Sequence, residues 1–121
     1  AYSMTALVYS RTMRDWRTHD GIDIACELGT QVKAVSSGTV CAVEDDDLFG
    51  TTVRIDHGAG LVSVYSNLAE LPTVKFGDVV TPGQVIGAVG DTALCETGEV
   101  THLHFAMTQD GESIDPAEKL P

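Results

Sequence analysis

Residues 101–105 read Thr-His-Leu-His-Phe, an alternation of polar and apolar side chains that predicts a β-strand. Alternate side chains of a strand point to the same face, so we expect His102 and His104 on one side, about 7 Å apart along the backbone. Leu103 and Phe105 should then face the opposite side. Two imidazoles can therefore reach one region of space.

A second polar stretch, His19-Asp20-Gly21-Ile22-Asp23, lies near the start of the chain. It offers an imidazole and a carboxylate, separated by a glycine that suits a loop running into a strand. Together with the strand histidines, this is the chemistry of a catalytic zinc site, in which three protein ligands leave a fourth position open. Two alternatives remain: the histidines and Asp23 are ordinary strand and turn residues, or a fourth ligand such as Cys95 closes a structural zinc site.

The residues between these stretches alternate in short segments separated by turn residues, which predicts strands joined by tight turns. Strands are expected at 21–25, 31–35, 38–43, 51–56 and 61–66. His57-Gly58-Ala59-Gly60 predicts a hairpin turn between the last two strands, with His57 as a structural residue that bonds to the backbone. The acidic run Glu44 to Asp47 predicts a solvated loop rather than a calcium site.

The glycine and valine spacing of residues 74–90 suits short strands at barrel-like corners. Biotinyl and lipoyl carrier domains share this pattern, but a carrier needs a lysine at an exposed hairpin tip, and Lys33, Lys75 and Lys119 are not so placed. Asp115-Pro116 predicts the start of one short C-terminal helix. The prediction is thus an all-β, antiparallel, partly closed sandwich or barrel-like fold with one terminal helix.

The composition predicts one domain, because the chain has 121 residues, of which 43% are apolar. We expect residues 1–18 to form an extended arm packed on a domain of residues 19–121, with Trp16 as its buried anchor. A formal charge of −11 argues against nucleic acid and anionic membranes as partners. Since no run of about 18 apolar residues and no signal peptide is present, membrane insertion by this segment is not expected, and any anchor would lie outside it.

The three cysteines, Cys26, Cys41 and Cys95, have wide and irregular spacing and cannot all pair within one chain. They are therefore expected as free thiols that act as small core or loop residues. Only Cys95, in the loop before His102, is placed to approach a metal.

Four motifs in one order carry a family resemblance: His-x-Gly-x-Asp at 19–23, Gly-Thr-x-Val-x-Ala-x-x-x-Gly-x-Val at 29–40, Tyr-x-x-Leu at 65–68 and His-Leu-His-Phe at 102–105. The chain resembles the lysostaphin/LytM-type zinc endopeptidases that cut peptidoglycan. The resemblance implies zinc as the cofactor and cell-wall peptides as the substrate. It implies the following roles: zinc ligands His19, Asp23 and His104, an outer active-site histidine His102, and a substrate contact Tyr65.

One position departs from the family pattern, because Asn67 stands where the family carries a second outer histidine. Asparagine cannot titrate, although its amide could donate a hydrogen bond to an oxyanion. Two hypotheses follow. The first is a metalloendopeptidase in which His102 transfers protons and Asn67 assists; the second is a catalytically degenerate module that binds wall peptides or a membrane-protein partner.

The segment Trp-Arg-x-His-x-Gly-x-Asp at 16–23 resembles the sporulation stage II Q-type branch, whose members are membrane-anchored and act during engulfment. This resemblance implies an extracytoplasmic location at the cell envelope, either secreted or anchored.

Overall fold

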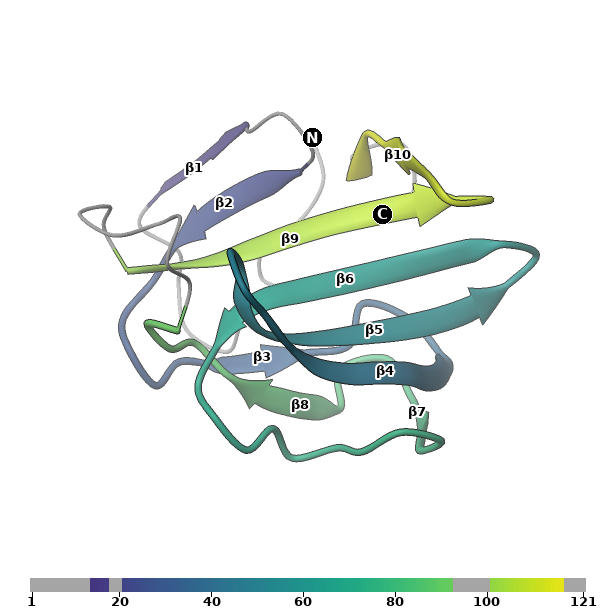
Figure 1. Ribbon diagram of the computed structural model, residues 1–121, viewed down its shortest axis with the longest axis horizontal. Coiled ribbons are helices and arrows are strands. Elements are labelled where there is room, and N and C mark those ends of the chain that lie inside the picture. The colour runs from purple at the N-terminus through teal and green to yellow at the C-terminus, as the bar shows by residue number, and fades with distance from the viewer. Residues whose placement is uncertain (1–13, 18–20, 93–100, 117–121) are drawn as a thin grey trace.

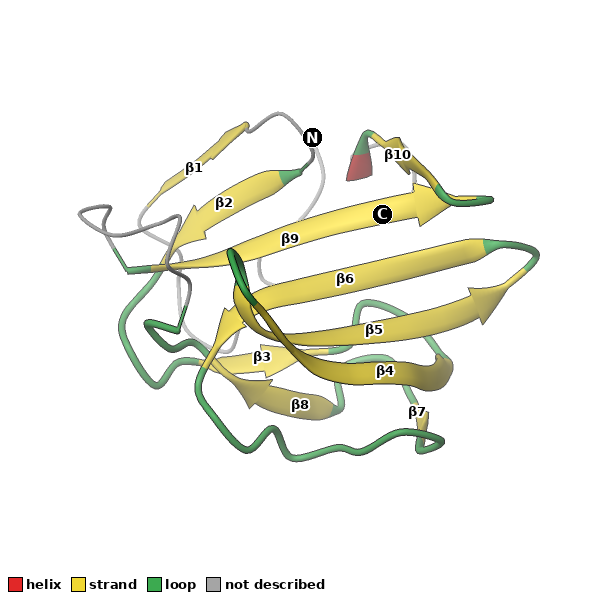
Figure 2. Ribbon diagram, viewed as in Figure 1, coloured by secondary structure: helices red, strands yellow, loops and turns green. Residues whose placement is uncertain are grey.

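The computed structural model describes residues 14–17, 21–92 and 101–116, and these residues form an almost entirely β-structured chain (Figure 2). Its elements are ten strands. In chain order they are β1 (Arg14–Arg17), β2 (Ile22–Ala25), β3 (Gln31–Lys33), β4 (Gly38–Asp46), β5 (Gly50–Gly58), β6 (Leu61–Leu68), β7 (Val79–Val80), β8 (Val85–Ala88), β9 (His102–Gln109) and β10 (Glu112–Ile114).

The strands form two antiparallel sheets (Figure 1). The large sheet has the order β1-β2-β9-β6-β5-β4-β7, and β10 pairs with β9 off this path. One edge of β9 is shared, because β2 pairs with its first half and β10 with its second half. The small sheet consists of β3 and β8. The predicted antiparallel all-β fold is confirmed, and within the described residues the large sheet stays open.

The hydrophobic core joins the two sheets. Val32 of β3 and Ile86 of β8 belong to the same buried cluster as Ile24, Leu103 and Phe105 of the large sheet. All five side chains are inaccessible to solvent. Burial of this apolar surface is the main favourable term in folding, so the sandwich arrangement holds the large sheet in place.

The acidic run is a correction to the sequence prediction. Residues Glu44 to Asp46 are not a solvated loop but the end of β4, which pairs with Thr52, Thr51 and Gly50 of β5. Glu44 and Asp45 are exposed there and Asp46 is partly exposed, so the end of this hairpin tolerates acidic side chains. The turn itself follows at residues 47–49.

Two predicted features fall partly or wholly outside the described residues. Of the expected N-terminal arm, Arg14–Arg17 forms β1 and pairs with β2, whereas residues 1–13 and the Trp16 side chain lie outside the description. The expected terminal helix falls mainly on residues 117–121, which are also outside it. In the part of the chain that the structure describes, no helix has the length and hydrophobicity needed to span a bilayer.

A buried polar network ties the hairpin of β5 and β6 to the rest of the fold. His57 bonds through Nδ1 to the Ser37 carbonyl and through Nε2 to Ser63 Oγ, both at 2.7 Å. Ser63 Oγ donates to the Tyr65 hydroxyl at 2.8 Å, which also accepts the Val35 amide N–H at 3.2 Å. The prediction that His57 is a structural, backbone-bonding residue is confirmed.

Gly21 lies directly before β2 and against the backbone of β9. A Cβ atom at this position would lie 2.3 Å from the Phe105 carbonyl oxygen and 3.1 Å from the Ala106 Cβ. Backbone atoms cannot move aside as a flexible side chain can, so only glycine allows β2 to approach β9 here.

The first prediction concerns Gly21→Ala, which should lower the free energy of unfolding by about 1–3 kcal/mol because the added methyl group pushes β2 away from β9. The measurement is urea unfolding followed by circular dichroism. Gly87→Ala is the matched control, since a Cβ there would meet its nearest atom, Leu68 Cδ1, at an ordinary 3.5 Å. Equal stability of the two variants would contradict the close approach.

The second prediction concerns Tyr65→Phe, which should lower the free energy of unfolding by about 1–3 kcal/mol because it leaves the buried Ser63 hydroxyl and the part-buried Val35 amide without their acceptor. Burial raises the pKa of Tyr65 from about 10 to about 12. The unfolded chain therefore loses the Tyr65 hydroxyl proton at a lower pH than the folded chain does. The contribution of Tyr65 to the free energy of unfolding is complete below pH 10 and is lost as the pH rises to 12. Unfolding measured between pH 8 and 12 should show a shallower alkaline decline in the variant than in the wild type. An identical decline would contradict the assignment.

Candidate metal centre and adjoining groove

Asp23 and His104 form the centre of the site. They lie opposite each other where β2 pairs with β9, and Asp23 Oδ1 is 2.5 Å from His104 Nδ1. Both side chains are almost fully buried, at 2% and 3% exposure. A carboxylate is costly to bury unless it is paired, and the imidazole provides that partner. The pairing brings together two of the three residues that the sequence predicted as metal ligands.

His102 faces the same carboxylate from the other side. Its Nε2 lies 3.7 Å from Asp23 Oδ2, and its side chain is also buried. Leu103 and Phe105 point to the opposite side of β9, into the core. The predicted alternation along this strand is therefore confirmed, and one carboxylate lies between two imidazoles.

The donor set suits zinc, because nitrogen and oxygen donors from His and Asp are typical zinc ligands. In the structure, Asp23 Oδ1 and His104 Nδ1 are at hydrogen-bonding distance, and a metal ion would take the place of the proton they share. Among residues 14–17, 21–92 and 101–116, no group of three or more His, Cys, Asp and Glu side chains has metal-site geometry. His19, the third predicted ligand, lies outside the described residues.

Asn67 connects the end of β6 to the start of β9. Its Nδ2 donates to the His102 carbonyl oxygen at 2.7 Å, and its side chain is 3% exposed. The backbone at Asn67 has a φ of +62°, a left-handed conformation that asparagine and histidine adopt more readily than most residues. In the structure Asn67 thus binds the backbone of β9, the strand that carries both histidines.

Tyr65, for which the resemblance implied a substrate contact, lies on the core side of the large sheet. It is fully buried, packs against Phe105 at a ring-centroid distance of 5.3 Å and uses its hydroxyl in the His57 network. Its neighbour Ser66 faces the other way and pairs with His104. Asp23 and His104, the predicted metal ligands, are thus on the same face of the sheet as Ser66.

A groove of about 190 Å³ opens on this face beside His104. Phe49 forms one wall, with its ring stacked on the His104 imidazole at a centroid distance of 5.0 Å and an angle of 14°. Ser66 and Thr52 line the floor and bond to each other at 3.0 Å. The sequence did not predict these groove residues, because alternation within a strand does not reveal which residues of neighbouring strands lie side by side.

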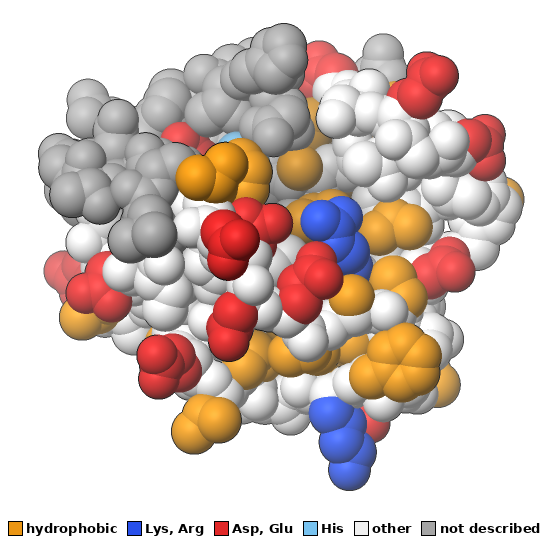
Figure 3. Space-filling view, in the orientation of Figure 1, with side chains coloured by type: hydrophobic (Ala, Val, Ile, Leu, Met, Phe, Trp, Pro, Cys, Tyr) orange, Lys and Arg blue, Asp and Glu red, His pale blue; other side chains and the backbone are white. Residues whose placement is uncertain are grey.

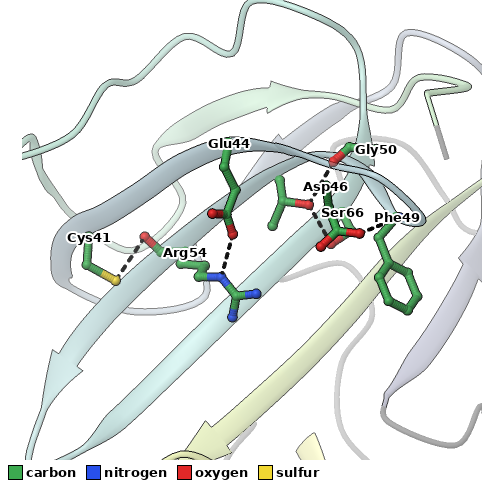
Figure 4. Close-up of polar contacts among 8 residues, drawn as sticks. Cys41, Glu44, Asp46, Phe49, Gly50, Arg54 and Ser66 are labelled. Carbon is green, nitrogen blue, oxygen red and sulfur yellow. Dashed lines mark hydrogen bonds and ion pairs between the residues drawn. The ribbon is translucent and has the colours of Figure 1, made fainter.

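The turn that carries Phe49 is held by Asp46, which is labelled with Phe49 in Figure 4. Asp46 Oδ1 accepts the amide N–H groups of Leu48 and Phe49, both at 2.9 Å. The hydrogen bond from Phe49, followed by that from Leu48, lowers the pKa of Asp46. This carboxylate is therefore ionised at neutral pH and fixes the wall of the groove.

The two cysteines within the description behave as expected for free thiols. Cys26 is buried in the core and donates to the Ile24 carbonyl at 3.3 Å, and burial raises its pKa to about 11. Cys41 is partly buried, and Figure 4 shows its sulfur bonded to the backbone carbonyl oxygen of Arg54. Cys95, which was considered as a metal ligand, lies outside the described residues.

Two curated proteins illustrate the relatives of this chain. It is 39% identical over 98 residues to stage II sporulation protein Q of Bacillus subtilis, covering 79% of this chain and 34% of that protein. It is 33% identical over 99 residues to the peptidoglycan DD-endopeptidase ShyA of Vibrio cholerae, covering 80% of this chain and 22% of that protein. The chain therefore spans about a third or less of the length of these two relatives.

Solved structures share the fold. A zinc-containing peptidase from Vibrio cholerae superposes with a TM-score of 0.76 and 31% identity, over 85% of this chain and 31% of that one. A chain of the SpoIIQ–SpoIIIAH pore-forming complex superposes with a TM-score of 0.74 and 35% identity, over 95% of this chain and 72% of that one. The family model that matches residues 17–116 is described as peptidase family M23, and the chain belongs to this family.

Proposed function

We propose that this chain is a zinc-binding endopeptidase domain that acts on the peptides of peptidoglycan at the cell envelope. The observation that carries the proposal is the Asp23–His104 pair at 2.5 Å, buried beneath a sheet face and flanked by His102. Family membership and the name of ShyA, a peptidoglycan DD-endopeptidase, support the substrate class. The zinc-containing peptidase neighbour supports the metal.

In this proposal Asp23 and His104 hold zinc together with His19. Zinc, when bound, supplies Lewis-acid polarisation of the scissile carbonyl and activation of water. His102, on the same side of β9, moves a proton through an imidazole nitrogen, because imidazole titrates near neutral pH. The Asp23 carboxylate also lies 3.7 Å from His102 Nε2, and Phe49 and Ser66 shape the groove in which the peptide lies.

A second candidate function is a catalytically degenerate module that binds wall peptides or a membrane-protein partner. The observation in its favour is Asn67, a residue that cannot titrate and whose amide nitrogen donates to the His102 carbonyl. The SpoIIQ–SpoIIIAH structure, a complex of two proteins, supports a partner of this kind. Under this proposal the domain keeps its fold and metal donors but uses them for recognition outside the cytoplasm.

The third prediction is that the purified chain binds about one zinc ion at neutral pH and that Asp23→Asn or His104→Ala weakens binding by more than about 100-fold, since each removes a ligand. Elemental analysis and competition with a zinc-binding dye give the occupancy and affinity. Asp45→Asn is the matched control because it changes the same charge on the exposed end of β4. Negligible zinc in the wild type would refute the metal assignment.

The fourth prediction separates the two functions. If Asn67 marks a degenerate site, Asn67→His should release new amino groups from purified peptidoglycan about 10²–10⁴ times faster than the wild type, the range typical of a general acid or base. Histidine tolerates the left-handed backbone of this position, so the variant is expected to fold, which circular dichroism checks.

Asp23→Asn, combined with Asn67→His, provides the inactive control for this experiment. Zinc-dependent hydrolysis by the wild type at a rate similar to that of Asn67→His would exclude the degenerate module. Absence of activity in both the wild type and Asn67→His, each folded and zinc-loaded, would instead exclude the endopeptidase.

A further inference from the structure

The groove beside the metal donors is built from two rows of side chains on one face of the sheet. The first row crosses the strands through Asp23, His104 and Ser66, which follow one another in the pairing of β2, β9 and β6. The next row on that face runs through Ala106, Val64 and Arg54 of β9, β6 and β5. Equivalent rows on one face of a sheet are about 7 Å apart.

Arg54 stands at the end of the second row and lines the groove. From strand geometry its Cα is roughly 12 Å from that of His104, two strands across and one row along. An extended peptide rises about 3.3 Å per residue, so the two positions can be reached by the same short peptide.

The guanidinium of Arg54 is oriented by Glu44 on the neighbouring strand. Its Nε donates to Glu44 Oε1 at 3.0 Å, and the two side chains are 39% and 46% exposed. An ion pair with this exposure contributes little to stability. Figure 4 shows the two terminal nitrogens of Arg54 on the side of the guanidinium that faces away from Glu44. Within the described residues, the recorded side-chain bond of Arg54 uses Nε, so the Nη atoms can present a planar fork.

The charges around the groove make Arg54 distinctive. It is the one Lys or Arg side chain among the described residues that line the groove, in a chain of net charge −11. Figure 3 shows Lys and Arg side chains set among acidic ones on this face of the molecule. Asp46, which also lines the groove, is engaged by the amides of Leu48 and Phe49. These amide hydrogen bonds leave Asp46 negatively charged, so the attraction of a ligand carboxylate to Arg54 depends on direct contact with its Nη atoms.

We propose that Arg54 is a specificity-determining residue that binds a carboxylate of the peptide lying in the groove. The inference rests on the proposed function, because it assumes a peptide in this groove. Two terminal N–H groups in one plane match the two oxygens of a carboxylate, a geometry that lysine cannot offer. Glu44 holds the fork in position, so the domain selects peptides that carry a free carboxylate within a few residues of the metal donors.

The fifth prediction uses three synthetic tetrapeptides of the sequence L-Ala-γ-D-Glu-L-Lys-D-Ala. One has both carboxylates free, one has the glutamate α-carboxyl amidated, and one has the C-terminal carboxyl amidated. The zinc-loaded wild type should bind the peptide with both carboxylates about tenfold more tightly than one of the two amidated forms, since hydrogen bonds to charged groups are roughly twice as strong as neutral ones. Isothermal titration calorimetry measures the dissociation constants, and the weaker form identifies the carboxylate.

Arg54→Gln should remove this preference, so that the free and amidated peptides bind with similar dissociation constants, and Arg54→Lys should restore only part of it. Lys75→Gln is the matched control, because it removes the same charge from an exposed position outside the groove. If the wild type binds all three peptides equally, or if Arg54→Gln keeps the preference, the role of Arg54 is refuted while peptide binding stands. If no peptide binds, both this inference and the peptide-binding proposal fail.

Discussion

The antiparallel pairing of β2 with β9 is the constraint on which the site depends. It places Asp23 opposite His104 although the two residues are 81 positions apart in the chain. Side chains of a strand alternate between faces, so a slip of one residue would turn Asp23 into the core and an isoleucine towards the histidines. Burial of Ile22, Ile24, Leu103 and Phe105 fixes the register, because every one of these side chains is inaccessible to solvent.

The same sheet geometry connects Asp23 and His104, two of the predicted metal ligands, with the groove. Ser66 follows His104 across the sheet, and Thr52 continues the row through its bond to Ser66. Asp23, His104 and the groove floor therefore belong to regular strands, which hold functional groups more precisely than loops do. Asn67 adds a tie at the end of β6, where its amide bonds to the backbone of His102. Only the Phe49 wall comes from a turn, and Asp46 holds that turn in place.

Much of the fold follows from the sequence alone, because two-residue alternation and glycine-rich turns mark most strands. The hairpin around His57, the two faces of residues 102–105 and the antiparallel all-β class were predicted correctly. The acidic run was predicted wrongly: charge suggested a loop, whereas pairing with residues 50–52 continues the strand. A run of charged residues indicates that a segment is exposed to solvent, but an exposed strand can be as acidic as a loop.

The site was only partly predictable. Local pattern placed His102 and His104 together, but the approach of Asp23 came from the family resemblance, since strand pairing across the chain is not encoded in local alternation. The same limit explains why Phe49, Thr52 and Arg54 were not recognised: each is unremarkable until β5, β6 and β9 are aligned side by side. For Tyr65 the alternation pattern predicted the strand correctly. It did not indicate which face of the sheet carries the site, and Tyr65 lies on the opposite, core-facing side.

The shared edge of β9 has a further consequence. Strands β2 and β10 each satisfy half of the backbone hydrogen bonds along that edge, from opposite ends of the sequence. A proteolytic cut that released β2 would remove Asp23 with it. The same cut would expose the unpaired edge of β9, the strand that carries Leu103 and Phe105. Unpaired strands of this kind recruit other chains, so loss of the carboxylate and self-association would occur in a single event.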